Sequence, residues 1–142
     1  MDRECGNRVT RATGRTADCD QQTRRGRLAK ARQFLSAADT ILVFSDEDLD
    51  LSDAYITLCV HAGIAAADAI CCALLGRHAI GESHGDAVGL LETARMDVAR
   101  HLDTLLKLKT RSGYGATPST LAARKQAGRA AAALLEVAGA VR

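Results

Sequence analysis

The feature that most constrains this chain is an apolar segment, residues 51–75, that is rich in small residues. Apolar side chains would occupy nearly all sides of the helix it predicts, which is typical of a helix at the centre of a bundle. Its alanines and Gly63 have little side-chain bulk, so neighbouring helices can approach closely. Asp68 interrupts the most apolar run, which is too short to span a bilayer. We therefore expect a central core helix that stops at Gly76, and no membrane attachment.

Three further segments have helical periodicity. Apolar residues recur at spacings of three and four over residues 25–44. Ser83 predicts a cap for a third helix that runs unbroken to about Arg111. Thr117 followed by Pro118 predicts the start of a fourth. We see no convincing run of strands, and residues 77–83 are expected to form a loop. Short connections between such helices predict an all-α fold, a four- or five-helix up-down antiparallel bundle.

The N-terminal segment, residues 1–24, has no apolar period. Its arginines are scattered among acidic residues, and such a segment buries too little surface to offset the entropy of ordering it. We expect a flexible Arg-rich tail, followed by one bundle domain over residues 25–142. The formal net charge of +2 is too small to indicate nucleic-acid or membrane binding by itself.

The cysteine pattern and the N-terminus predict a cytoplasmic protein. No apolar signal-peptide core precedes the helices. No Cys-x-x-Cys pair is present, so we expect reduced thiols that act as small buried apolar side chains, with no metal and no cofactor. The cysteines are Cys5, Cys19, Cys59, Cys71 and Cys72.

The most specific candidate site is a cationic cluster at the end of the third helix. Lys109 and Arg111 are followed by Tyr114 within a Gly-Tyr-Gly sequence. Two cations suit a phosphate, and the tyrosine ring suits a stacked base. The alternative is a favourable placement of positive charge at the negative end of the helix dipole.

Polar residues on the apolar helix are a second candidate. Asp53 lies at its start, where a carboxylate also suits the helix dipole. His61 and Asp68 are seven residues apart and share nearly the same face, so both are candidates for ligand contact. The competing interpretation is that they are satisfied, buried hydrogen-bond partners.

Arg95 and His101 are the third candidate. An arginine that stabilises phosphorane charge and a histidine that acts on the ribose 2′-hydroxyl would suit metal-free RNA cleavage. On a continuous helix, however, six residues place the two side chains about 120° apart. This geometry argues against a catalytic pair.

Residues 25–140 resemble the HEPN family of helical bundles, which occur in prokaryotic defence and toxin–antitoxin systems. The resemblance is carried by the Ala-rich helix after Asp53, by Ser83-His84, and by Leu108-Lys109 followed after four residues by Tyr114. It implies a bundle that forms a homodimer. Active members are metal-independent endoribonucleases with an Arg-x4–6-His motif. Lys109, or less well Arg111, stands where the family arginine is expected, and no histidine follows either residue. Lysine lacks the planar arginine fork.

We therefore expect a non-catalytic binding or regulatory module that contacts a nucleotide, RNA or a partner protein through Lys109, Arg111 and Tyr114. The alternative is an enzyme, a metal-independent endoribonuclease that uses Arg95 and His101, or Arg111 with Tyr114. A third hypothesis is an antitoxin-like or structural partner whose tail orders on binding.

Overall fold

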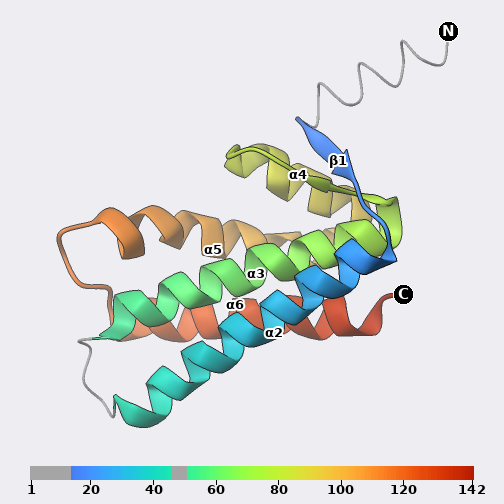
Figure 1. Cartoon of the computed structure of the whole chain (residues 1–142). Helices are drawn as coiled ribbons and strands as arrows, with labels where there is room; N and C mark the ends of the chain where they lie inside the picture. The colour runs from blue at the N-terminus through green and yellow to red at the C-terminus, as the bar shows by residue number, and fades with distance from the viewer. Residues whose placement is uncertain (1–13, 46–50) are drawn as a thin grey trace, which may run out of the picture.

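The computed structural model describes residues 14–45 and 51–142 of the chain. It confirms the all-α prediction: these residues form five helices and a single pair of three-residue strands (Figure 1). In chain order the elements are β1 (Thr16–Asp18), α2 (Gln21–Phe44), α3 (Ser52–Leu75), β2 (Arg77–Ala79), α4 (His84–Ala94), α5 (Met96–Tyr114) and α6 (Leu121–Ala140).

The four long helices lie alongside one another, and successive members α2, α3, α5 and α6 run in alternating directions (Figure 1). The short α4 folds back beside the strands. α3 contacts α2, α5 and α6, so its apolar surface is covered by the same chain. The prediction of a central core helix is confirmed, and the apolarity of α3 does not require a second copy to cover it.

The interior is aliphatic and tightly packed around Gly63 of α3. A Cβ atom added at Gly63 would overlap the side chain of Leu105 from α5 and touch that of Leu134 from α6. Gly128 of α6 gives room in the same way to the Tyr55 hydroxyl. Small residues thus let three helices approach closely. The largest fully buried apolar side chains are Ile56, Val60, Ile70, Leu90, Leu91, Leu102, Leu105 and Leu134.

α3 is the one helix in the described residues that is long and apolar enough to cross a membrane. Central helices of water-soluble bundles pass the same test. In this fold 61% of its most apolar window is buried inside the molecule, as expected of a core helix.

The end of α3 carries a small antiparallel ribbon of β1 and β2, in which Ala17 faces His78. We call residues 14–19 with β2 the ribbon. The strand β2 lies where a loop was predicted, and the described residues 14–24 are not a tail. They contain β1 and the first turn of α2, which begins four residues earlier than expected because the Asp20 side chain accepts the Thr23 N–H at 2.8 Å. Residues 1–13 lie outside the described part. So do Asp48 and Asp50, either of which the sequence predicts as a possible cap for the helix that follows.

A disulfide joins Cys19, in the N-terminal segment of the ribbon, to Cys72 on α3. The prediction that all cysteines are reduced is therefore wrong for this pair. It is confirmed for Cys59 and Cys71, which are free and buried. The pairing brings together residues separated by 53 positions, which no local pattern in the sequence indicates.

Two predicted helix boundaries also change. The third predicted helix is two helices, because Arg95 has extended backbone angles of φ −151° and ψ 90° and separates α4 from α5. The last helix begins at Leu121 rather than at Pro118. Its cap is Thr120, whose side chain accepts the Ala123 N–H, while the preceding Ser119 N–H donates to Asp53.

Candidate ligand-binding site

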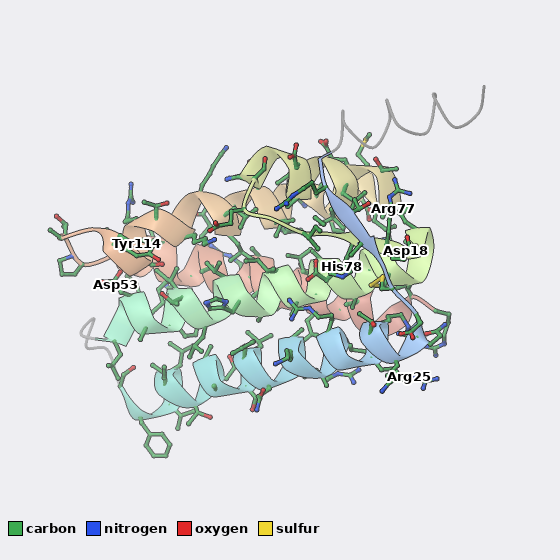
Figure 2. The ribbon with its side chains drawn as sticks, turned by 45° about the horizontal axis from the view of Figure 1, so that its top comes forward. Asp18, Arg25, Asp53, Arg77, His78 and Tyr114 are labelled. Carbon is green, nitrogen blue, oxygen red and sulfur yellow. A yellow bond between two sulfur atoms is a disulfide. The ribbon has the colours of Figure 1, made fainter. Side chains whose placement is uncertain are left out.

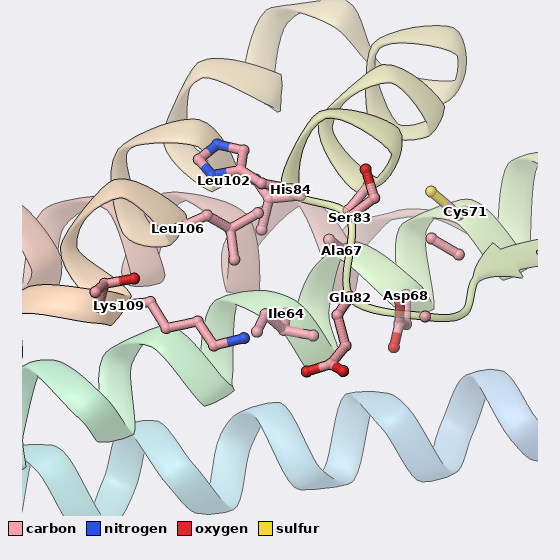
Figure 3. A pocket seen from close by; sticks show the side chains of 14 residues that line it. Ile64, Ala67, Asp68, Cys71, Glu82, Ser83, His84, Leu102, Leu106 and Lys109 are labelled. Atoms are coloured by element: carbon pink, nitrogen blue, oxygen red, sulfur yellow. The ribbon is translucent and has the colours of Figure 1, made fainter. Parts of the chain in front are cut away.

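A cavity of about 240 Å³ opens between the second half of α3, the segment that follows β2, and α5 (Figure 3). Its apolar lining is Ile64, Ala67, Ala79, Ala87, Leu102 and Leu106. Its polar lining is Asp68, Cys71, Glu82, Ser83, His84, Lys109 and Thr110. An apolar surface with a few convergent polar groups is the usual composition of a small-molecule site.

The ribbon and the start of α4 position one rim of the cavity. Gly81 has a positive φ of 91°, so a glycine suits the turn after β2. Ser83 then caps α4 by accepting the Asp86 N–H at 3.2 Å. The predicted cap by Ser83 is confirmed. The turn and the cap together fix where Glu82 and His84 meet the cavity.

Asp68 lies at the cavity wall and is held by two basic residues. Its Oδ2 accepts from Arg27 Nε at 3.0 Å, and its Oδ1 lies 3.9 Å from His78 Nδ1. Burial raises the pKa of Asp68 above its ordinary value of 3.8, although Arg27 and then His78 act in the opposite direction. The Asp68 side chain therefore mainly links α3 to α2 and to the ribbon. These contacts favour the interpretation of Asp68 as a satisfied hydrogen-bond partner.

His84 is held at the cavity by α5. Its Nε2 lies 2.8 Å from Asp103 Oδ1, while Lys107 Nζ lies 2.9 Å from Asp103 Oδ2. The hydrogen bond from Lys107 and then that from His84 lower the pKa of Asp103. A carboxylate only accepts, so Nε2 carries a proton in this pair.

Lys109 and Glu82 are the two cavity residues of opposite charge without an assigned partner. Neither side chain has a hydrogen bond or ion pair within the described residues. Figure 3 shows the Lys109 ammonium and the Glu82 carboxylate on the same side of the cavity, with Ile64 between them. The rim therefore offers one cation and one anion beside an apolar wall.

Cys71 places a free thiol in the cavity wall. Its side chain is only 3% exposed, and burial raises the pKa of the thiol to about 12. A thiol with such a pKa is protonated at neutral pH and is a poor nucleophile. The Cys71 thiol is therefore unreactive as long as it stays buried.

The predicted cationic cluster is divided by the helix on which it lies. Lys109 lines the cavity, whereas Arg111 and Tyr114 do not. Two residues along α5 correspond to a rotation of about 200°, so Lys109 and Arg111 lie on opposite sides of the helix. Tyr114 is 84% exposed, at the end of the bundle where Figure 2 also shows Asp53. A single phosphate site built from all three residues is not formed in this structure.

Asp53 and His61 have structural contacts outside the cavity. Asp53 Oδ1 accepts the Ser119 N–H at 3.2 Å and so anchors the segment before α6. The exposed His61 ring lies against Phe34 of α2, with ring centroids 5.6 Å apart. Because Asp68 also contacts α2, the prediction that His61 and Asp68 share a face is confirmed. Of the three, only Asp68 lines the cavity.

Arg95 and His101 are related through Asp97. Both Nε and Nη2 of the exposed Arg95 donate to the Asp97 carboxylate at 2.8 Å. Burial, followed by the positive charge of Arg100, lowers the pKa of His101, and Asp97 partly offsets this effect. The angular argument against the pair assumed one continuous helix and is wrong, because Arg95 lies at the break. The guanidinium is nevertheless already occupied by a carboxylate.

Sequence reasoning missed Glu82, Thr110, Asp103 and the role of Cys71. His84 was visible as a loop histidine, but its partner Asp103 is 19 residues away in a different helix. A hydrogen bond of this kind depends on the angle between α4 and α5, which follows from the break at Arg95. No pattern in the sequence around Arg95 indicates that break.

No protein-family model matches this chain, and no curated protein matches it.

Proposed function

We propose that this protein is a non-catalytic binding module and that its ligand is a small aliphatic zwitterion of the amino-acid type. The observation that carries the proposal is the composition of the cavity: an apolar wall with a cation, Lys109, and an anion, Glu82, that have no assigned partners in the described residues. In such a ligand the carboxylate would meet Lys109, the ammonium would meet Glu82, and the aliphatic part would contact Leu102 and Leu106.

Size and composition favour this ligand over a nucleotide. A volume of about 240 Å³ is below the range of roughly 300–1,000 Å³ typical of sites for drug-sized ligands. No Phe, Tyr or Trp side chain lines the cavity, and its one ring is the His84 imidazole, so it offers no large aromatic surface on which a base would stack. The resemblance to HEPN bundles, the homodimer and a role in defence remain predictions for this module. Light scattering at micromolar concentration measures the predicted dimer.

The experiment is a calorimetric titration with four probes: leucine, isovalerate, isopentylamine and AMP. Isovalerate lacks the ammonium group together with the carbon that carries it, and isopentylamine lacks the carboxylate, so each probe removes one of the two proposed charge contacts. We expect leucine to bind most tightly. At a leucine concentration ten times Kd, binding would stabilise the folded protein by about 1.4 kcal/mol.

Lys109→Met and Arg111→Met are the matched variants. Both residues are exposed cations on α5, but only Lys109 lines the cavity. We expect leucine and isovalerate to lose affinity for Lys109→Met and to keep it for Arg111→Met. Equal losses in the two variants, or no heat from any aliphatic probe, would contradict the proposal. Tighter binding of AMP than of leucine would favour the nucleotide-binding alternative.

The enzyme alternative is separated by incubating purified protein with RNA in the presence of a chelator. The proposal predicts intact RNA. Cleavage that persists in chelator and disappears in His101→Ala would replace the binding module with a metal-independent ribonuclease, and it would assign a role to the Arg95–Asp97 pair beside that histidine.

A further inference from the structure

We propose that the ribbon is a cap over one side of the ligand cavity and that the Cys19–Cys72 disulfide holds this side closed, so that a dithiol reductant opens a second side of a cavity that already admits ligand in the oxidised chain. The inference rests on the proposed function, because it describes how access to the same cavity is regulated. It is carried by the contacts of the ribbon.

The ribbon is continuous with the rim of the cavity. Ala79 at the end of β2 lines the cavity, and Gly81 to His84 follow it directly along the rim. Residues 14–19 hold β2 at both of its ends. Cys19 N–H donates to Gly76 O at 3.0 Å, and Ile80 N–H donates to Arg15 O at 3.1 Å.

Residues 14–19 also reach the first turn of α4. Gly14 lies so close to Asp86 that an added Cβ would overlap the carboxylate side chain. Residues 14–19 therefore cross from the start of α4 to the end of α3 (Figure 1). Displacing them removes the partners of β2 and of the rim that follows it.

The disulfide is the covalent part of this arrangement. The ribbon pairs only three residues with three, and a short two-stranded ribbon is marginal by itself in water. Without the bond, residues 14–19 remain attached through α2 but lose their link to Cys72. Local opening of the ribbon then requires only the rupture of a few hydrogen bonds, and its free energy falls well below that of global unfolding.

Reduction is a balanced two-step exchange with a dithiol. Cys72 is buried and Cys19 is partly exposed, so the first reductant thiolate attacks Cys19 Sγ. The Sγ–Sγ bond breaks, and Cys72 leaves as a thiolate that takes up a proton. The second thiolate of the reductant attacks the reductant sulfur in the mixed disulfide, which releases Cys19 and forms the oxidised reductant. Two electrons and two protons pass from the reductant to the two cysteines.

Two free cysteines of the chain can report on this opening: Cys71 as the reporter and Cys59 as the control. Cys71 is free, buried and lines the cavity, so opening of the ribbon exposes it. Cys59 lies on the same helix, is also free, and is fully buried in the core. The pKa of each thiol is raised by burial, to about 12 and about 11 respectively. Only Cys71 should respond to a local opening.

The test measures alkylation by excess iodoacetamide in oxidised protein and in a Cys19→Ser/Cys72→Ser variant, with each site quantified by peptide mass spectrometry. We expect alkylation of Cys71 to be about tenfold faster in the variant, and Cys59, which reacts only on global unfolding, to stay much less reactive than Cys71. Equal rates at Cys71 in the two proteins would overturn the proposal. So would equal reactivity of Cys59 and Cys71 in the variant, which reports global unfolding rather than a local cap.

A second measurement uses the unaltered chain. Backbone hydrogen exchange is followed before and after dithiol treatment. The Ile80 amide should exchange faster after treatment, and faster than the amides of residues 55–63, which exchange on global unfolding. An unchanged Ile80 amide would overturn the inference. Neither readout needs a ligand: leucine binding with unchanged Cys71 reactivity rejects the cap alone, whereas faster alkylation without any binding supports the cap and rejects the proposed function.

Discussion

Small residues have opposite effects on packing in the two halves of α3. In the first half, Gly63 lets side chains from α5 and α6 reach the helix axis, and the space is filled. In the second half, Ala67 and Cys71 leave a cavity whose rim is supplied by the ribbon and α4. Small side chains produce dense packing where long helices approach one another closely. They leave a cavity where the short ribbon and α4 cover the helix without filling the space.

The halves also differ in how they are held. The first half depends on apolar contacts between helices, which are many and individually weak. The second half depends on a few specific links: the Cys19–Cys72 bond, the Arg27–Asp68 ion pair and the His84–Asp103 contact. Each link is a single point at which the cavity can be altered while the core stays intact.

The largest effect is expected from removal of the disulfide. The bond closes a loop with a sequence separation of 53, and in the chain-entropy account its loss in Cys19→Ser/Cys72→Ser costs about 4 kcal/mol of unfolding free energy. Urea unfolding with and without dithiol measures this cost. A midpoint of the unaltered chain that does not move on reduction would show that the link between the ribbon and α3 is not important for stability.

A smaller effect is expected from filling the first half of α3. Gly63→Val places two methyl groups against Leu105 and Leu134 and should destabilise the fold by about 1–3 kcal/mol through overpacking. Gly89→Ala on α4 is the control, because open space surrounds its Cβ position, and it should stabilise by about 0.5–1 kcal/mol. Chemical denaturation compares them. Similar stabilities for both variants would mean that the core is not as dense as described.

Sequence alone was sufficient for the first half and insufficient for the second. The periodicity and small residues of 51–75 predict a buried central helix, because dense packing leaves a strong apolar signature. The cavity depends instead on the backbone break at Arg95, on a three-residue strand and on the pairing of Cys19 with Cys72. Each is a long-range or marginal feature with no local pattern. Lys109 was predicted because a cation near a helix end is visible in the sequence, whereas Glu82, the rim residue of opposite charge, was not predicted.

The pH dependence of stability tests the second half through Asp68. Burial raises its pKa in the folded state, so the folded protein holds this proton more tightly than the unfolded chain. That contribution is fully present below 3.8 and is lost as pH rises through the folded-state pKa. The unfolding free energy of the unaltered chain minus that of Asp68→Asn should therefore fall with rising pH in this window. A difference that rises would mean that Arg27 and His78 outweigh burial.

The smallest effect on stability is expected from Lys109→Met. This exposed side chain has no ion-pair partner in the described residues, so its replacement should leave the urea midpoint unchanged while leucine affinity is lost. A clear loss of stability would show that Lys109 supports the fold, and the reduced binding would then not report a direct contact.

The most direct test of the binding cavity is methyl NMR of the unaltered, oxidised chain during titration with leucine. The account predicts chemical-shift changes at the methyl groups of Ile64, Leu102 and Leu106, which line the cavity, and none at Leu134, which is buried in the first half of the core. The changes should be absent in Lys109→Met. Unchanged cavity methyl signals at millimolar leucine, or equal changes at Leu134, would contradict it.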